Sequence, residues 1–123
     1  MSKNRVAGEI SFKVDGTREY AKGSFTYNLG GFKRDPVVGS DEVHGFKETP
    51  KVPFIEGEIT DRGDLDLKTF QHLTDVTVTL ELVNGKTIIL RDAWYAHDGD
   101  VTTEEAVVPV RFEGRTAEEM TDG

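Results

Sequence analysis

The chain has 123 residues, the size of a single domain. Its 15 Lys and Arg residues are outnumbered by 23 Asp and Glu, and the formal net charge of -8 argues against a general attraction to nucleic acid or to an anionic membrane. There is no cysteine, which excludes disulfides and thiolate chemistry, and no apolar run is long enough to cross a bilayer. No apolar stretch follows the first residues, so we expect no signal peptide.

Two stretches near the N-terminus alternate between apolar and polar side chains. Arg5–Val14 and Lys22–Leu29 each place every second residue on an apolar face, and this period of two predicts half-buried β-strands. Between them Asp15-Gly16 is a turn signal, because glycine adopts the positive φ that a tight hairpin needs. We expect the two strands to pair as the first hairpin.

Residues 30–48 show no sustained period and contain several glycine and proline turn signals. We predict a long loop between the second and third strands. Such a loop is usually functional or disordered when it occurs in a compact domain. This one also contains apolar residues without a local partner, so it either docks onto another chain or folds back over the body. Those apolar residues are Phe32, Val37, Val38, Val43 and Phe46.

The middle of the chain has two further amphipathic strands with a helix between them. Val52–Thr60 and Asp75–Val83 alternate as strands do. Asp66 precedes a helical pattern at Leu67–Leu73, and its carboxylate can accept hydrogen bonds from the free N–H groups of a first helical turn. We therefore predict one short helix, capped by Asp66.

Asn84-Gly85 is a strong hairpin signal, and the return strand Lys86–Tyr95 is apolar on both faces. A two-residue turn would pair Leu80 with Ile89 and place Ile89 toward the core. The opposite face of this strand would then be covered by the helix or by a neighbouring subunit. The residues on that opposite face are Ile88, Leu90 and Trp94.

A last strand is predicted at Glu105–Phe112, where Pro109 favours an edge or a bulge because it cannot donate to a ladder. Residues 1–4 and 115–123 are polar and aperiodic, so we expect flexible tails around a single domain at residues 5–114. The elements add up to a mainly β fold. We predict an antiparallel β-sandwich or split barrel with one short α-helix and a long loop between strands two and three.

No residue pattern requires an active site or a cofactor. The three histidines lack the spacing of a helical zinc site, and the acidic turn at Asp98–Asp100 lacks that of an EF-hand. Glu56 and Glu58 share one strand face, but outward carboxylates on a strand are usually solvated. We expect no cofactor and no enzyme, and a metal-dependent hydrolase built on these acids is the enzymatic alternative.

Four segments stand out by their order and spacing, since none is diagnostic alone: GSFTYNLGGFKRDPVVGSDEVHGFKETPKVPFIEGEITD, LDLKTF, LELVNGKTIILRDAWYA and VPVRFEG. Together they resemble the tail tube protein family of Mu-like contractile-tailed bacteriophages. The similarity extends over residues 5–114. Members of that family are also similar in architecture to the tube proteins of type VI secretion systems.

The resemblance implies a structural virion protein of the phage tail, assembled in the host cytoplasm. In this family, subunits form stacked hexameric rings inside a contractile sheath, and their sheets close around a channel through which DNA passes without specific binding. The implied partners are further copies of the chain, the sheath, the tape measure protein, and the baseplate and terminator proteins, with no membrane. The alternative from a different class is a monomeric small-molecule-binding β-barrel.

Three sets of residues are assigned within this expectation. The channel-lining candidates, which otherwise form an outer solvated face, are Glu56, Glu58, Thr60, Thr77, Thr79 and Glu81. The loop candidates for contacts between subunits or rings are Phe32, Lys33, Arg34, Asp35, Val37, Val38 and Phe46. The strand candidates that face a neighbouring subunit are Ile88 and Leu90.

Overall fold

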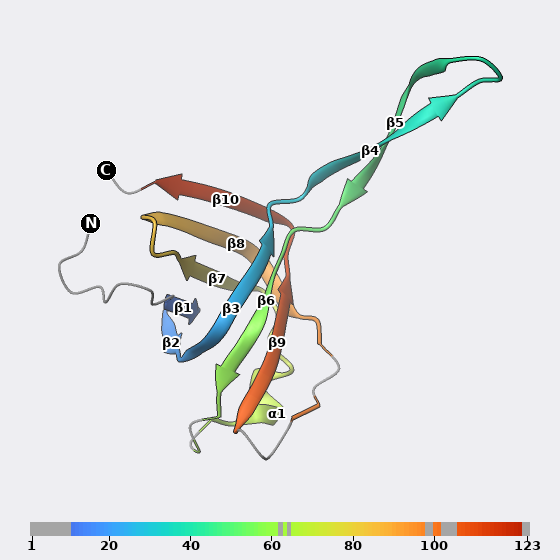
Figure 1. Cartoon of the computed structure of the whole chain (residues 1–123). Helices are drawn as coiled ribbons and strands as arrows, with labels where there is room; N and C mark the ends of the chain where they lie inside the picture. The colour runs from blue at the N-terminus through green and yellow to red at the C-terminus, as the bar shows by residue number, and fades with distance from the viewer. Residues whose placement is uncertain (1–10, 62, 64, 98–99, 102–105, 122–123) are drawn as a thin grey trace.

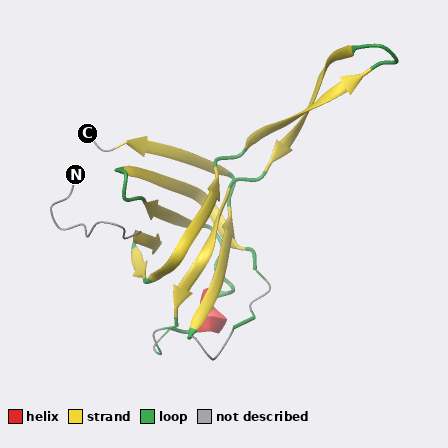
Figure 2. Ribbon diagram, in the orientation of Figure 1, coloured by secondary structure: helices red, strands yellow, loops and turns green. Residues whose placement is uncertain are grey.

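The structure, a computed structural model, describes residues 11–61, 63, 65–97, 100–101 and 106–121 (Figure 1). This part of the chain forms ten strands, all paired antiparallel, and one short helix (Figure 2). In chain order the elements are β1 (Ser11–Val14), β2 (Thr17–Glu19), β3 (Ala21–Asn28), β4 (Gly31–Val38), β5 (Val43–Lys51), β6 (Phe54–Thr60), α1 (Leu67–Phe70), β7 (Val76–Glu81), β8 (Lys86–Tyr95), β9 (Val107–Glu113) and β10 (Thr116–Thr121). The predicted mainly β fold with one short helix is confirmed.

The strands of the body form two layers that face each other across a shared core (Figure 1). The first layer has the order β2-β1-β7-β8, with β10 paired to the other side of β8. The second layer has the order β9-β6-β3. The end of β8 joins the two layers, because Trp94 and Tyr95 pair with Glu113 and Phe112 of β9. Among the described strands the path does not close, so the body is a sandwich or split barrel.

The core is built from alternate residues of the strands in both layers. The ring centroid of Phe112 lies 5.7 Å from that of Phe70 in α1 and 5.5 Å from that of Tyr95 in β8. Burial of each large apolar side chain contributes about 1.5–3 kcal/mol, so the predicted alternation is what holds the layers together. Other fully buried residues are Phe12, Ile55, Ile59, Val78, Leu80, Ile88, Leu90, Val108 and Val110.

The first hairpin differs from the prediction in its partner strand. The turn at Asp15-Gly16 is present, but it joins β1 to the short β2, and the other edge of β1 pairs with β7. The strand predicted at Lys22–Leu29 corresponds to β3 and pairs with β6. Phe25 and Tyr27 of β3 pack against the shared core from the second layer. Burial of these two rings therefore places β3 in the opposite layer from β1.

The hairpin of β7 and β8 is shifted by one residue from the predicted register. Leu80 pairs with Ile88, and the Leu82 N–H donates to the Lys86 carbonyl at 2.8 Å. The loop therefore has three residues and ends with Gly85 at a φ of 92°. A shift of one residue exchanges the two faces of a strand. The prediction that Ile88 and Leu90 face a neighbouring subunit is wrong, since both are 0% exposed within the chain.

Two segments that we expected to lack regular structure form strands. The predicted loop at residues 30–48 lies in a β-hairpin of β4 and β5, which we call the arm (Gly31–Lys51). The two strands of the arm pair their backbone groups along the edge that they share, so the arm forms a ladder without the periodicity of a core strand. The predicted flexible tail at residues 115–123 is wrong for Thr116–Thr121, which pairs with β8 as β10. β7 pairs with one edge of β8, and β10 pairs with the other edge.

The helix α1 is shorter than predicted but is capped as predicted. Asp66 accepts the Thr69 N–H at 3.2 Å and the Thr69 hydroxyl at 2.9 Å. Phe70 is buried, whereas Lys68 is exposed. No helix in the described part of the chain is long and apolar enough to cross a membrane.

Pro109 lies where β9 extends beyond the end of β8. It pairs with Glu58 of β6 on one side, while β8 pairs with β9 no further than Phe112. On the other side the Tyr95 hydroxyl donates to the Pro109 carbonyl at 3.1 Å. Burial raises the pKa of Tyr95, which keeps this donor protonated. The predicted edge position of Pro109 is confirmed.

Candidate assembly surfaces

The arm extends away from both layers of the body (Figure 1). The ladder between its strands runs from Gly31 opposite Lys51 to Val38 opposite Val43, with a bulge before the tip. Because directly opposite residues share a face of a hairpin, this register sorts the arm into two faces. Nearly all described residues of β4 and β5 are exposed, so both faces of the arm are open to a partner.

One face of the arm is aromatic and apolar. It carries Phe32, Pro36 and Phe46, and the exposed fractions of the two phenylalanines are 61% and 56%. The guanidinium carbon of Arg34 lies 4.7 Å from the ring centroid of Phe46, and its Nε lies 3.4 Å from an oxygen of Glu48. Exposed aromatic residues clustered in this way mark an interaction site.

The other face of the arm is charged. Lys33, Asp35 and Lys47 lie on it, with the Lys33 Nζ 3.7 Å from an oxygen of Asp35. The two strands of the arm together carry four Lys or Arg and two Asp or Glu residues. The turn between them adds Asp41 and Glu42, so the arm as a whole has no net charge. The loop candidates of the sequence analysis therefore divide between these two faces, with Val37 and Val38 near the tip.

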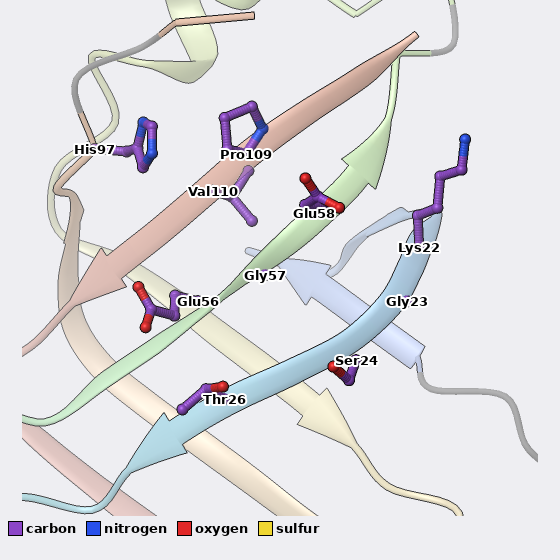
Figure 3. Close-up of a pocket in the computed structure, with 10 residues that line it drawn as sticks. All are labelled: Lys22, Gly23, Ser24, Thr26, Glu56, Gly57, Glu58, His97, Pro109 and Val110. Carbon is purple, nitrogen blue, oxygen red and sulfur yellow. The ribbon is translucent and has the colours of Figure 1, made fainter. Parts of the chain in front are cut away.

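The outer face of the second layer carries the first three channel-lining candidates, Glu56, Glu58 and Thr60 of β6. A groove of about 530 Å³ lies on this face, beside the bulge of β3 between Lys22 and Thr26. The residues that line it are labelled in Figure 3. Glu56 and Glu58 project from β6 along the groove, with His97 at one side (Figure 3). The groove has a mixed polar and apolar lining, which does not select a ligand by itself.

Arg111 of β9 organises the charges on this face. Its Nη1 lies 3.0 Å from Glu56 Oε2, its Nε lies 3.0 Å from Glu113 Oε2, and its guanidinium carbon is 4.0 Å from the Phe54 ring centroid. Partial burial opposes the charged form, but the hydrogen bonds to Glu113 and Glu56 outweigh it and raise the pKa of Arg111. Glu56 is therefore held in an ion pair across β6 and β9, and is not poised for catalysis.

The outer face of the first layer carries the other three channel-lining candidates, Thr77, Thr79 and Glu81 of β7. Glu81 pairs with Lys13 of β1 at 3.2 Å. Farther along the same layer, Arg91 Nε lies 2.9 Å from Glu118 Oε1 of β10, and this hydrogen bond raises the pKa of Arg91. Lys13 and Arg91 thus each have a carboxylate beside them, and a further cation of this face, Arg18 of β2, lies directly opposite Lys13.

The structure does not bring the two halves of the predicted channel lining together. Ile55 and Ile59 of β6 point into the core from one layer, and Val78 and Leu80 of β7 point into it from the other. Their outward neighbours, the candidates on β6 and β7, therefore lie on opposite sides of the body. A single channel surface can include one set and not both.

Sequence reasoning missed Arg91, Arg111 and Glu118. The sequence contains a signal for Arg111, because it alternates in the last strand with the apolar residues that point inward. This alternation predicts that Arg111 lies on the outer face. Among the described residues no group of His, Cys, Asp and Glu side chains could hold a metal ion. The acids of the predicted turn at Asp98 and at residues 102–105 lie outside the described residues.

Comparison with known proteins adds three findings. The chain is 27% identical over 97 residues to the Mu-like prophage FluMu tail tube protein of Haemophilus influenzae, which covers 79% of this chain and 81% of that protein. It is similar in structure to a sheath/tube terminator of an extracellular contractile injection system, with a TM-score of 0.64 and 9% identity over 98% of this chain and 99% of that one. It is also similar to Hcp1 from Flavobacterium johnsoniae, with a TM-score of 0.59 and 11% identity over 93% of this chain and 99% of that one. These two likenesses establish a shared fold.

A family model described as phage tail tube protein matches residues 3–119. This match covers nearly the whole chain and confirms the resemblance drawn from the four sequence segments. The chain therefore belongs to the phage tail tube protein family, whose members are structural components of the virion tail and not enzymes.

Proposed function

We propose that this chain assembles with copies of itself into stacked hexameric rings, and that the rings form a tube whose channel passes DNA inside a contractile sheath. The observation that carries the proposal is the arm, which extends from the body with its aromatic face exposed. In a monomer this face stays in water at a cost in free energy. Contact with a second copy removes it from water.

The position of the arm favours a ring or a stack over a closed dimer. The arm projects from one side of the body, and its aromatic face differs in chemistry from both outer faces of the layers. A contact between two different surfaces repeats from copy to copy, which generates rings or open helical stacks. This is the symmetry that a tube requires.

The first layer, and not the second, is the proposed channel wall. A sheet that continues from subunit to subunit needs a free strand edge on both sides. In the described part of the chain, β2 and β10 leave such edges at the two sides of the first layer. In the second layer, β9 is closed off by Pro109 and by the Tyr95 hydroxyl. Thr77, Thr79 and Glu81 then face the channel, and Glu56, Glu58 and Thr60 face outward.

The chemistry of the proposed wall suits passage of DNA without binding. Two of the cations on this wall are already paired, Lys13 with Glu81 and Arg91 with Glu118. The third described cation, Arg18, lies opposite Lys13. Paired cations release few counterions on contact with phosphate, so they contribute little affinity for DNA.

The sheath is proposed as the partner of the outward face, with the tape measure protein inside the tube and terminator and baseplate proteins at its ends. The likeness to chains from sheath–tube and terminator complexes supports the sheath and the terminator as partners. Membership of the tail tube family argues against the alternative of a monomeric small-molecule-binding β-barrel. The sheet path of the described strands also does not close into a barrel.

Electron microscopy of the purified chain at rising concentration tests the proposal. We expect rings and then tubes. A variant that joins Gly30 directly to Val52, and so lacks the arm, should stay monomeric while keeping the thermal unfolding midpoint of the body. A wild-type chain that stays monomeric at all concentrations would contradict the proposal, as would an armless variant that forms tubes as readily as wild type.

A further inference from the structure

A small apolar slot lies between α1 and the hairpin of β1 and β2. It has a volume of about 270 Å³, and its apolar wall includes Leu65, Phe70, Leu73 and Val76. This volume is large enough for one aromatic side chain. The slot lies outside the proposed channel wall and outside the groove of Figure 3.

The rim of the slot is acidic. Asp15 and Asp66 line it, and no Lys or Arg is among its described lining residues. Asp15 accepts the Thr77 N–H at 2.8 Å. Hydrogen bonds from the backbone and then the side chain of Thr69 lower the pKa of Asp66 and keep its carboxylate ionised. The slot therefore suits an aromatic ring that carries a cation beside it.

The arm presents such a pair. The ring of Phe46 is 56% exposed and has the guanidinium of Arg34 over it at 4.7 Å. The guanidinium of Arg34, which also lies 3.4 Å from Glu48 Oε1, is opposite in charge to the carboxylates of the rim. An aromatic ring in an apolar pocket, with an oppositely charged rim, is the usual form of an interface hot spot.

The arm and the slot lie at opposite ends of the molecule. In Figure 1 the arm extends from the upper end of the body and α1 lies at the lower end. The slot of a chain is therefore out of reach of its own arm, and the arm that fills it must come from another copy. Repetition of this head-to-tail contact builds an open stack.

We propose that the slot beside α1 in one copy receives the arm of the next copy, with Phe46 between Leu65 and Leu73 and Arg34 beside Asp66. This contact rests on the proposed self-assembly and names the surface that receives the arm. It accounts for both the exposed ring on the arm and the unfilled apolar volume under α1.

Crosslinking in assembled tubes tests the contact directly, because the chain has no cysteine of its own. Pro36 lies opposite Phe46 in the arm, and Thr17 lines the slot. The double variant Pro36→Cys with Thr17→Cys should give a ladder of multimers with a short bismaleimide. The matched control pairs Pro36→Cys with Thr26→Cys, an exposed threonine of the other groove, and should give no ladder. Equal ladders in the two variants, or no ladder from tubes visible by electron microscopy, would overturn the proposal.

The concentration needed for assembly provides a second test. We expect Phe46→Ala to raise it about tenfold or more, because a buried ring is lost from each contact. Asp66→Asn keeps the helix cap but removes the charge, so it should raise the concentration less and weaken its dependence on salt. The double variant Asp66→Asn with Arg34→Gln should raise the concentration needed for assembly little more than either single variant does.

The two proposals fail separately. If Phe46→Ala forms tubes at the wild-type concentration, the slot is not the receiving surface, although self-assembly stands. If the wild-type chain forms no assembly at all, self-assembly fails and the slot contact fails with it.

Discussion

The ring of Phe25 packs directly against the backbone of Gly57. A Cβ on residue 57 would lie 2.7 Å from the Cγ and Cδ1 atoms of that ring, closer than van der Waals contact allows. The bulge of β3 between Lys22 and Thr26 includes Phe25, whose ring centroid is also 5.0 Å from that of Phe12. Glycine at position 57 is thus required by packing between the two layers.

Gly57→Ala should lower the free energy of unfolding by about 1–3 kcal/mol, because the ring must leave its present position. Urea denaturation of the unassembled chain measures this. Phe25→Leu on its own should also destabilise the chain, but the double variant should lose less than the sum of the two. A Gly57→Ala chain as stable as wild type would show that the ring moves freely.

Arg111→Gln should lower the free energy of unfolding by about 1 kcal/mol, a modest value because solvent screens this partly exposed cluster. The change removes the ion pairs to Glu56 and Glu113 and the contact with Phe54. Arg111→Lys should recover little of the lost free energy of unfolding, since a single ammonium cannot hold two carboxylates and stack on a ring. The difference from wild type should shrink in about 1 M salt. Equal denaturation midpoints at low salt would contradict this account.

Asp66 should contribute to the pH dependence of stability. Its folded-state pKa is lowered from the ordinary value of 3.8 by hydrogen bonds from the Thr69 N–H and hydroxyl. A carboxyl with a depressed pKa stabilises the fold above its unfolded pKa, and this contribution is lost as pH falls through the folded value. Asp66→Asn keeps the cap without titrating. As the pH falls below about 4, wild type should therefore lose stability relative to the Asp66→Asn variant. A stability difference between the two that is constant with pH would remove this role.

Thr79→Lys and Thr60→Lys form a matched pair on opposite faces of the body. If the first layer lines the channel, Thr79→Lys places a ring of unpaired cations on the path of the DNA. In virions, we expect it to reduce infectivity by at least about tenfold while tubes still form. Thr60→Lys, on the outward face, should leave DNA passage within about twofold of wild type. The reverse outcome would place the face of β6 in the channel.

Ending the chain after Arg115 should destabilise the body. The truncation removes the strand that pairs with one edge of β8 along Lys86–Arg91, leaves the pairing with β7 on the other edge, and removes Ala117 from the core boundary. We expect a loss of about 2 kcal/mol or more, measured by thermal or urea unfolding. Glu118→Ala, which keeps the strand and removes the carboxylate beside Arg91, should remain close to wild type. A truncated chain of unchanged stability would mean that β10 contributes no fold energy.

Particular elements separate what could be predicted from what could not. The inward residues of β1, β6 and β7 followed from alternation, and the cap at Asp66 followed from its place before an apolar helical pattern. The face of β8 was predicted wrongly because a three-residue loop shifts the register by one, and one residue exchanges Ile89 for Ile88 on the core side. The predicted channel lining likewise combined residues of β6 and β7, and these two strands belong to different layers.

The sequence by itself determined the class of the fold, the positions of most strands and the short capped helix, because these depend on neighbouring residues along the chain. It also carried the family resemblance in the order of its segments. Only the tertiary structure decided that β3 crosses to the second layer, that β10 completes the edge of β8, and that residues 31–51 stand away from the body as an arm. Those outcomes depend on which distant strand edges and apolar faces meet, and such long-range pairing leaves no local period in the chain.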